Sequence, residues 1–229
     1  MTGAATSALA GRRIAPSILA ADYARLGSQL AEVLEAGARV IHVDVMDGHF
    51  VPPITVGPLI VAAVREQVHA AGGVLDVHLM IERPERQIAE FARAGADVIT
   101  VHAEATPHVR YALDHVREAG ARAGLALNPA TPAETVAALG AAVDQVLCMT
   151  VNPGWGGQRF IDGSLEKVAR LRALVPPEVP VEVDGGVDED TVAACAEAGA
   201  SLFVAGSAVF GRPDPAEAYR RLAEAADAV

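Results

Sequence analysis

The feature that most limits the fold of this chain is a regular alternation of two kinds of segment. Short runs rich in Val, Ile and Leu alternate with Ala-rich runs of helical character, and eight such pairs follow one another. This order is typical of parallel βα units. The expected strands are 14–19, 40–45, 74–79, 98–102, 122–127, 145–149, 181–183 and 202–205. The expected helices are 22–36, 58–70, 84–94, 107–119, 132–139, 164–174, 189–198 and 215–225.

Residues that start and stop helices support these boundaries. Pro84, Pro107 and Pro132 suit the first turn of a helix, where a missing N–H costs nothing. An Ala-Gly-Ala phrase recurs just before four expected strands, at 36–38, 94–96, 119–121 and 198–200. Eight βα units favour a single-domain (β/α)8 TIM barrel, an α/β fold, over an open doubly wound sheet. The sequence contains no Walker A motif and no G-x-G-x-x-G after the first strand, which weakens nucleotide-binding alternatives.

We expect residues 13–229 to form the barrel and residues 1–12 to be a flexible N-terminal tail. A chain of 229 residues is long enough for one such barrel. The tail lacks a basic segment before an apolar one, which argues against a secretory signal. No apolar run is long enough to span a membrane. The two cysteines, Cys148 and Cys195, suggest no disulfide framework, so a reducing cytoplasm is expected.

The formal net charge of −11 limits the ligands of the protein. Nucleic-acid binding depends largely on clustered Lys and Arg, so no nucleic-acid partner is expected. A phosphate-bearing ligand would have to be held by local groups such as backbone N–H donors, because the overall field repels it.

The strand at 40–45 has an unusual polar face. Alternate side chains of a strand share a face, so His42, Asp44 and Met46 point to one side and apolar residues to the other. A buried charge is costly unless it is paired or coordinated. This spacing therefore permits a pair of metal ligands and predicts that the function lies here.

Other polar side chains occupy the corresponding end of the remaining strands. In a TIM barrel, residues at the C-terminal ends of several strands form the active site. The candidates by this rule are Ser17, Asp76 and His78, His102 and Glu104, Asn128, Asn152, Asp184, and Gly206-Ser207.

Six motifs in the order of the strands resemble one known family. They are Pro16-Ser-Ile-Leu-Ala-Ala-Asp22, His42-Val-Asp-Val-Met-Asp-Gly-His-Phe-Val-Pro52, Asp76-Val-His-Leu-Met80, Asn152-Pro-Gly-Trp-Gly-Gly-Gln158, Val183-Asp-Gly-Gly186 and Ala205-Gly-Ser-Ala-Val-Phe210. Together they closely resemble ribulose-phosphate 3-epimerase, a (β/α)8 isomerase of carbohydrate metabolism in the pentose phosphate pathway and Calvin cycle. The resemblance runs from about residue 13 to the C-terminus. Trp155 departs from it, because Phe is expected there.

The resemblance implies a reaction that inverts a carbon next to a carbonyl. Removing a proton from one face and returning one to the other requires two acid/base groups on opposite sides of the substrate. Asp44 and Asp184 match the two catalytic aspartates of the family. The expected reaction interconverts D-ribulose 5-phosphate and D-xylulose 5-phosphate through an ene-diolate.

The resemblance also implies one divalent metal ion per subunit. The family's metal ligands correspond to His42, Asp44, His78 and Asp184. Two imidazoles and two carboxylates suit zinc, with iron(II), manganese or cobalt as alternatives. Such an ion would stabilise the negative charge of the ene-diolate as a Lewis acid.

The family's substrate contacts correspond to a further set of residues. Ser17 and His78 match polar contacts, and Met46, Met80 and Met149 match thioethers that exclude water. Phosphate is expected at backbone N–H groups of three glycine-rich segments, the last of which begins a short final helix. These segments contain Gly154, Gly156 and Gly157; Gly185 and Gly186; and Gly206 and Ser207.

Three polar residues receive structural roles. His102 is expected to be structural or to support a ligand from behind. Asp76 shares a strand face with His78 and is expected either to orient it or to anchor the barrel. Asp47 is interpreted as a turn residue rather than a third catalytic acid.

Rival functions on the same fold are a 3-epimerase of a hexulose 6-phosphate such as D-allulose 6-phosphate, and a non-catalytic sugar-phosphate binder. A decarboxylase or Schiff-base aldolase usually needs a lysine at a strand end, and the single lysine, Lys167, falls in an expected helix. The family forms homo-oligomers, so a homo-oligomer is expected here.

Overall fold

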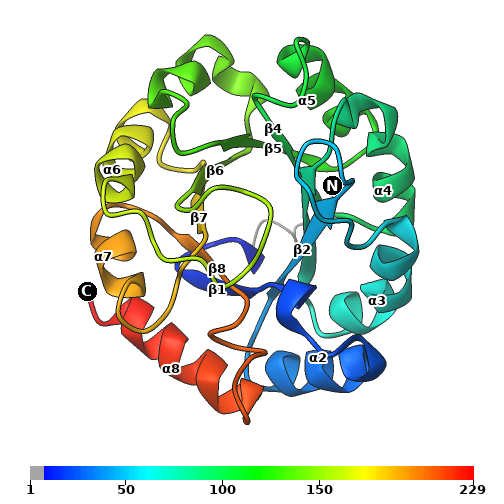
Figure 1. Cartoon of the computed structure of the whole chain (residues 1–229), viewed down its shortest axis with the longest axis vertical. Coiled ribbons are helices and arrows are strands. Elements are labelled where there is room, and N and C mark those ends of the chain that lie inside the picture. Colours follow the sequence, from blue (N-terminus) through cyan, green and yellow to red (C-terminus); the bar gives the residue numbers. More distant parts are fainter. Residues whose placement is uncertain (1–7) are drawn as a thin grey trace.

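The computed structural model describes residues 8–229, and in this part of the chain eight parallel strands form a ring inside a ring of helices (Figure 1). The order of the strands around the sheet is β1-β8-β7-β6-β5-β4-β3-β2. The sheet is closed between β1 and β2 by a single parallel bridge, Ser17 to His42. The predicted TIM barrel is confirmed, and its seam runs beside the polar face of β2.

The strands are β1 (Arg13–Pro16), β2 (Val40–Met46), β3 (Val74–Met80), β4 (Val98–His102), β5 (Arg122–Leu127), β6 (Gln145–Met149), β7 (Val181–Asp184) and β8 (Leu202–Ala205). The α-helices are α2 (Leu26–Glu35), α3 (Pro58–Ala70), α4 (Ile88–Ala94), α5 (Val109–Glu118), α6 (Ser164–Leu174), α7 (Val192–Glu197) and α8 (Pro215–Asp227). The 3-10 helices are η1 (Ile18–Ala20), η2 (Tyr23–Arg25), η3 (Pro84–Arg86), η4 (Ala133–Ala138) and η5 (Gly140–Ala142).

The first strand is shorter than predicted because a side chain ends it. The Ser17 hydroxyl accepts a hydrogen bond from the backbone N–H of Leu19 at 3.3 Å and caps η1. Asp22 caps η2 in the same way, through the N–H of Ala24 at 3.0 Å. The expected helix 22–36 therefore divides into η2 and α2. Local side-chain acceptors compete with both strand and helix in this segment.

Other helices also differ from the prediction. The expected helix 132–139 is the 3-10 helix η4, because the few residues between Pro132 and Gly140 give little length for a cooperative α-helix. The helix expected at 189–198 begins at Val192, because the Asp188 carboxylate accepts hydrogen bonds from the N–H groups of Asp190 and Thr191.

Alternation along the strands separates two apolar regions. Outward residues such as Val43, Val77 and Phe203 are fully buried between the strands and the surrounding helices. Inward residues at the strand starts form a second cluster, which includes Val40, Val74 and Leu202. Layers of inward side chains that fill the barrel are the expected packing for this fold.

The bottom of the barrel is closed by residues from before β1. Ala8 and Leu9 are buried in the cluster formed by the inward residues at the strand starts. The prediction of a flexible tail over residues 1–12 falls partly outside the described residues, but residues 8 and 9 pack on the barrel. Within residues 8–229, no helix combines the length and apolar character needed to cross a bilayer.

Truncating Leu9 should destabilise the fold. Its side chain is 4% exposed, so Leu9→Ala is expected to lower the free energy of unfolding by about 2–5 kcal/mol. Leu59→Ala, at a side chain that is 86% exposed, should change it by less than about 0.5 kcal/mol. Urea unfolding of the two variants measures both values. Equal stabilities would show that residue 9 does not seal the barrel.

Candidate active site and metal centre

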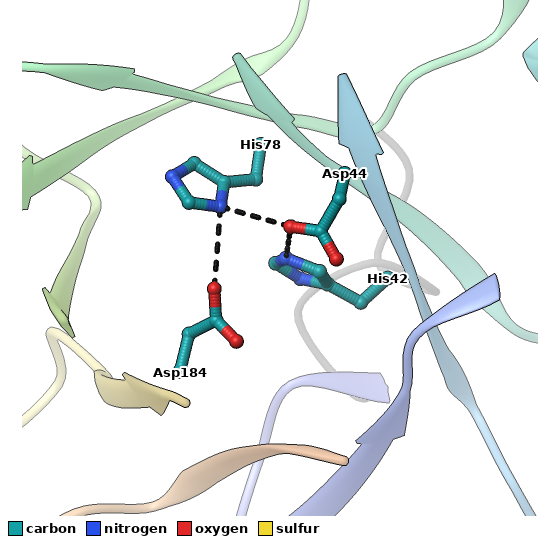
Figure 2. Close-up of side chains that lie close together, drawn as sticks. All are labelled: His42, Asp44, His78 and Asp184. Carbon is teal, nitrogen blue, oxygen red and sulfur yellow. Dashed lines mark hydrogen bonds and ion pairs between the residues drawn. The ribbon is translucent and has the colours of Figure 1, made fainter. Parts of the chain in front are cut away.

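Four polar side chains converge inside the C-terminal mouth of the barrel (Figure 2). They are His42 and Asp44 on β2, His78 on β3 and Asp184 on β7. Each offers one ligand atom, and these atoms lie within 4.8 Å of one another. In Figure 2, Asp44 and Asp184 reach the same nitrogen of His78 from two different strands.

Strand register explains how distant residues meet. Asp44 is directly opposite His78 in the β2–β3 ladder, and Asp184 is opposite Met149 in the β6–β7 ladder. All of them point inward because side chains alternate along each strand. The curvature of the closed sheet then brings the end of β7 to within reach of β3.

The contacts in the cluster join ring nitrogens to carboxylates. His78 Nδ1 lies 3.2 Å from Asp44 Oδ1 and 3.5 Å from Asp184 Oδ2. His42 Nε2 lies 3.3 Å from Asp44 Oδ1 but has no hydrogen-bond partner among the described residues. The Ser17 hydroxyl donates to the other oxygen of Asp44 at 2.5 Å. The same Ser17 forms the bridge that closes the barrel.

The residues fit a divalent metal ion. A buried nitrogen without a partner is costly, and His42 Nε2 is such an atom, directed at two carboxylates and a second imidazole. Mixed nitrogen and oxygen ligands suit zinc and other first-row divalent ions. The cluster can therefore hold one metal ion, of an identity that this donor set leaves open.

Burial opposes the charges in this cluster, and opposite charges outweigh it. Burial lowers the pKa of His42, but the carboxylates of Asp44 and Asp76 raise it well above the usual range. Burial raises the pKa of Asp44, but His42 and His78 lower it below the usual range. Without a metal ion, the imidazoles thus carry protons that neutralise the carboxylates. A divalent cation can replace those protons.

Asp76 contacts His42 and Gln145 rather than His78, so of its two expected roles the structural anchor fits and the orientation of His78 does not. Asp76 is opposite His42 in the β2–β3 ladder, and its Oδ2 accepts a hydrogen bond from His42 Nδ1 at 2.8 Å. That bond leaves Nε2 of the ring directed at the metal cluster. Asp76 therefore orients His42, its neighbour on the adjacent strand β2, and not His78, which lies two residues further along β3.

Sequence reasoning missed a buried polar network below the cluster. Gln145 Nε2 donates to Glu182 Oε2 at 2.7 Å and to Asp76 Oδ1 at 3.3 Å. Burial and the nearby Asp76 raise the pKa of Glu182 well above its usual range, so Glu182 keeps its proton. The pattern Val181-Glu182-Val183-Asp184 places Glu182 and Asp184 on the face opposite Val181 and Val183. This alternation could have predicted that Glu182 points into the barrel.

His102 and Glu104 continue the polar contacts away from the cluster. His78 Nε2 lies 2.8 Å from His102 Nε2, and His102 Nδ1 lies 3.2 Å from Glu104 Oε2. Burial lowers the pKa of His102 to about 4. Burial raises the pKa of Glu104, but hydrogen bonds from His102, Thr131 and the Asn128 N–H lower it to about 2. At neutral pH His102 is neutral and Glu104 is ionised.

A cavity of about 800 Å³ opens above the cluster. Both aspartates and most of the expected substrate contacts line it: Ser17, Met46, Met80, Met149, Gly154, Gly156, Gly157, Gly185, Gly186, Gly206 and Ser207. The expected contact His78 does not line it and is fully buried behind the aspartates. Arg212, which sequence reasoning missed, is the single Lys or Arg among the described residues that line it. In Figure 1 the yellow-green loop after β6, which carries Trp155, reaches over the centre of the ring.

Packing alone requires glycine at two of these positions. A Cβ atom at Gly185 would lie 2.3 Å from a Val151 methyl, and one at Gly186 would lie 2.6 Å from the backbone nitrogen of Phe160. Both residues also have positive φ, 117° and 66°.

The short final helix expected after Gly206 is a single turn, in which the Gly206 carbonyl accepts from Val209 and Phe210. Among the described residues, no α-helix begins at this turn to support an anion.

Two other expectations are settled by contacts. Asp47 Oδ1 accepts hydrogen bonds from the N–H groups of His49 and Phe50, and Oδ2 accepts from Glu82, so Asp47 is a turn residue as predicted. Lys167 lies in α6, and its Nζ donates to the carbonyl of Asn128 at 2.5 Å rather than lining the cavity.

Comparison with known proteins identifies similar sequences along most of the chain. Residues 13–210 match the sequence model of the ribulose-phosphate 3 epimerase family. Ribulose-phosphate 3-epimerase of Bacillus subtilis is 50% identical over 214 residues, covering 92% of this chain and 97% of that protein. The Escherichia coli K12 enzyme of the same name is 46% identical over 204 residues, covering 88% and 90%.

A solved structure with a similar fold is KGPDC from Streptococcus mutans. Its TM-score is 0.72, with 16% sequence identity and coverage of 96% of this chain and 99% of that one. At this identity the likeness concerns the barrel alone.

A divalent ion should stabilise the folded chain, because it binds the folded state only. For chelator-treated protein, Zn²⁺ at about 100 times its Kd should raise the unfolding temperature by roughly 5–10 °C. His42→Ala should abolish this rise, because it removes the nitrogen directed at the cluster. The matched control is His108→Ala, at an exposed histidine before α5, which should keep the rise. Differential scanning calorimetry measures the shifts, and an unchanged rise in His42→Ala would exclude this cluster.

Proposed function

The chain belongs to the ribulose-phosphate 3-epimerase family, whose members are isomerases, and we propose that it interconverts D-ribulose 5-phosphate and D-xylulose 5-phosphate. The observation that carries this proposal is that Asp44 on β2 and Asp184 on β7 both reach Nδ1 of the His78 ring and both line one cavity. The alternative is a 3-epimerase of a hexulose 6-phosphate such as D-allulose 6-phosphate.

The two aspartates would act as acid and base at C3. One carboxylate takes the proton from one face of the carbon, and the other, protonated, delivers a proton to the opposite face. The side chains are 5% exposed for Asp44 and 15% for Asp184, so both are shielded from water yet line the cavity. The Ser17 hydroxyl and His78 hold Asp44 in place. In the reverse reaction the two carboxyl groups exchange roles.

A bound divalent ion, held by His42 Nε2, Asp44, His78 Nδ1 and Asp184, would supply positive charge that stabilises the negative charge developing on the substrate oxygens. The apolar wall would protect the intermediate from solvent. Met46 and Met80, at the ends of β2 and β3, pack with Val51, and Met149, at the end of β6, packs with Ala126 and Val151. Flexible thioethers suit a wall that must contact a thin carbon chain.

The phosphate of the substrate would bind where the cavity is lined by the residues that follow β7 and β8. The backbone N–H groups of Gly185, Gly186, Gly206 and Ser207 donate to no carbonyl in the described part of the chain. Convergent free amides bind oxyanions without a net positive charge, which suits a chain of charge −11. Arg212 adds one cation to this lining. We further propose a cytoplasmic enzyme, consistent with the free, buried Cys148 and Cys195.

A turnover assay in deuterium oxide tests the reaction and its substrate. Metal-loaded protein should convert ribulose 5-phosphate with incorporation of deuterium at C3, because the proton returned comes from a solvent-exchanged carboxyl group. Mass spectrometry and NMR of the product measure the label. No incorporation would leave a non-catalytic binder, and a large preference for the hexulose phosphate would overturn the substrate assignment.

Replacing either aspartate should stop epimerisation. Asp44→Asn and Asp184→Asn are nearly isosteric but remove the base, so turnover should fall by at least about 100-fold with the fold intact. Each variant keeps the other carboxylate and should exchange the C3 hydrogen of one epimer only, with opposite epimers for the two variants. Asp190→Asn, at an exposed carboxylate after β7, is the matched control. Near-normal turnover in either active-site variant would contradict the two-aspartate scheme.

A Schiff-base aldolase is disfavoured by the place of Lys167. Its ammonium group donates to the carbonyls of Asn128 and Pro129 and does not line the cavity. Formation of a Schiff base needs a free amine beside the substrate carbonyl. The homo-oligomer expected from the family stays a prediction.

A further inference from the structure

We propose that Glu104 and His102 act as a positioning relay that keeps a proton on Nε2 of His78, so that Nδ1 of the same ring is the atom available to the metal ion. The inference rests on the proposed metal centre and extends it by two residues outside the ligand set. Its starting point is the chain of contacts from the cluster through His78 and His102 to Glu104.

The direction of each hydrogen bond follows from Glu104, the last residue in this series of contacts. Ionised Glu104 can only accept, so its contact with His102 Nδ1 at 3.2 Å requires a proton on that nitrogen. Two ring nitrogens 2.8 Å apart can hold only one proton between them, and the proton of His102 is already on Nδ1. His102 Nε2 therefore accepts at 2.8 Å, and His78 Nε2 must carry the donated proton.

The ring geometry agrees with an N–H···N hydrogen bond. The planes of His78 and His102 are inclined by only 26°, and their centroids are 4.9 Å apart. The two Nε2 atoms are much closer to each other than the centroids are, so the rings meet edge to edge. Phe50 packs against the His102 ring at 4.8 Å between centroids and holds it in place.

The consequence for the metal site is a choice of ring nitrogen. Because Nε2 of His78 is occupied by its proton, the nitrogen that can lose a proton is Nδ1, which lies between Asp44 and Asp184. In His42 a single residue fixes the proton position, since Asp76 accepts a hydrogen bond from Nδ1 and leaves Nε2 for the ion. Outer hydrogen bonds that set the tautomer of a ligating histidine are a general feature of metal sites.

The relay begins near the surface, on a loop that other residues hold. The Glu104 side chain is 24% exposed. Its second oxygen, Oε1, accepts hydrogen bonds from the Asn128 N–H at 2.9 Å and from the Thr131 hydroxyl. Lys167 binds the carbonyl of Asn128. Each carboxylate oxygen thus has separate partners: Oε2 accepts from His102, and Oε1 accepts from the loop after β5.

That division allows a matched set of variants of the full chain. Glu104→Gln keeps the size of the side chain but replaces one acceptor oxygen with a donor, so it cannot serve both His102 and the loop. His102→Phe keeps the ring and removes the relay. Thr131→Val loses a loop contact of Glu104 and leaves Oε2 facing His102, so it serves as the control for a merely structural role.

The first measurement is Zn²⁺ affinity, by competition with a chelating dye. Glu104→Gln and His102→Phe should weaken binding by about 10–100-fold, the usual effect of losing an outer partner of a ligating histidine. Thr131→Val should bind Zn²⁺ like the unaltered chain. Equal affinity in all variants would overturn the relay, as would an equal loss in Thr131→Val.

The second measurement reads the proton positions directly. Nitrogen-15 NMR of the metal-free protein should show a proton on His102 Nδ1 and on His78 Nε2, and Glu104→Gln should disturb this pattern. A proton on His102 Nε2 in the unaltered chain would overturn the relay whether or not Zn²⁺ binds. A chain that binds Zn²⁺ with the expected proton pattern but fails to epimerise would refute the proposed reaction and leave the relay standing.

Discussion

Ionisable groups enclosed by the barrel are the constraint on which the rest of the structure depends. His42, His78 and Asp76 are fully buried, and Asp44 nearly so. Charges removed from water destabilise a fold unless opposite charges or hydrogen bonds compensate them. Each group therefore has a partner on a neighbouring strand, and the parallel register of β2 and β3 supplies two of these pairs, His42 with Asp76 and Asp44 with His78. The fold and the site share one network of contacts.

The interior of the barrel is layered in a way that protects this network. Apolar residues at the strand starts, with Ala8 and Leu9 beneath them, close the bottom. The polar layer lies in the middle, and methionines with Val51 form the wall of the open end. In the described part of the chain, the aspartates are therefore open to water on the side of the cavity. A low local dielectric strengthens the electrostatic interactions in which these groups take part.

Much of the site was predictable from residue type and alternation, and the remainder depended on which strands are neighbours. The inward direction of His42 and Asp44 follows from a period of two along one strand. The partner of His42 does not, because Asp76 reaches it across the β2–β3 ladder, whereas the prediction gave Asp76 either His78 on its own strand or a structural role as an anchor. His102 was assigned a supporting role, but its contact with His78 depends on the position of a third strand. Glu182 was missed although the alternation of β7 places it on the inner face.

The resemblance to a known family supplied the residues proposed for metal binding and for proton transfer. The sequence by itself determined the (β/α)8 architecture and the strand ends at which polar side chains gather. Local spacing carries this information, because period and turn chemistry act over a few residues. Only the tertiary structure decided which nitrogen of each histidine faces the cluster, that His78 lies behind the cavity wall, and that the short helix expected after Gly206 is a single turn. These features depend on distances between strands that are far apart in the chain, and the closure of the barrel sets those distances.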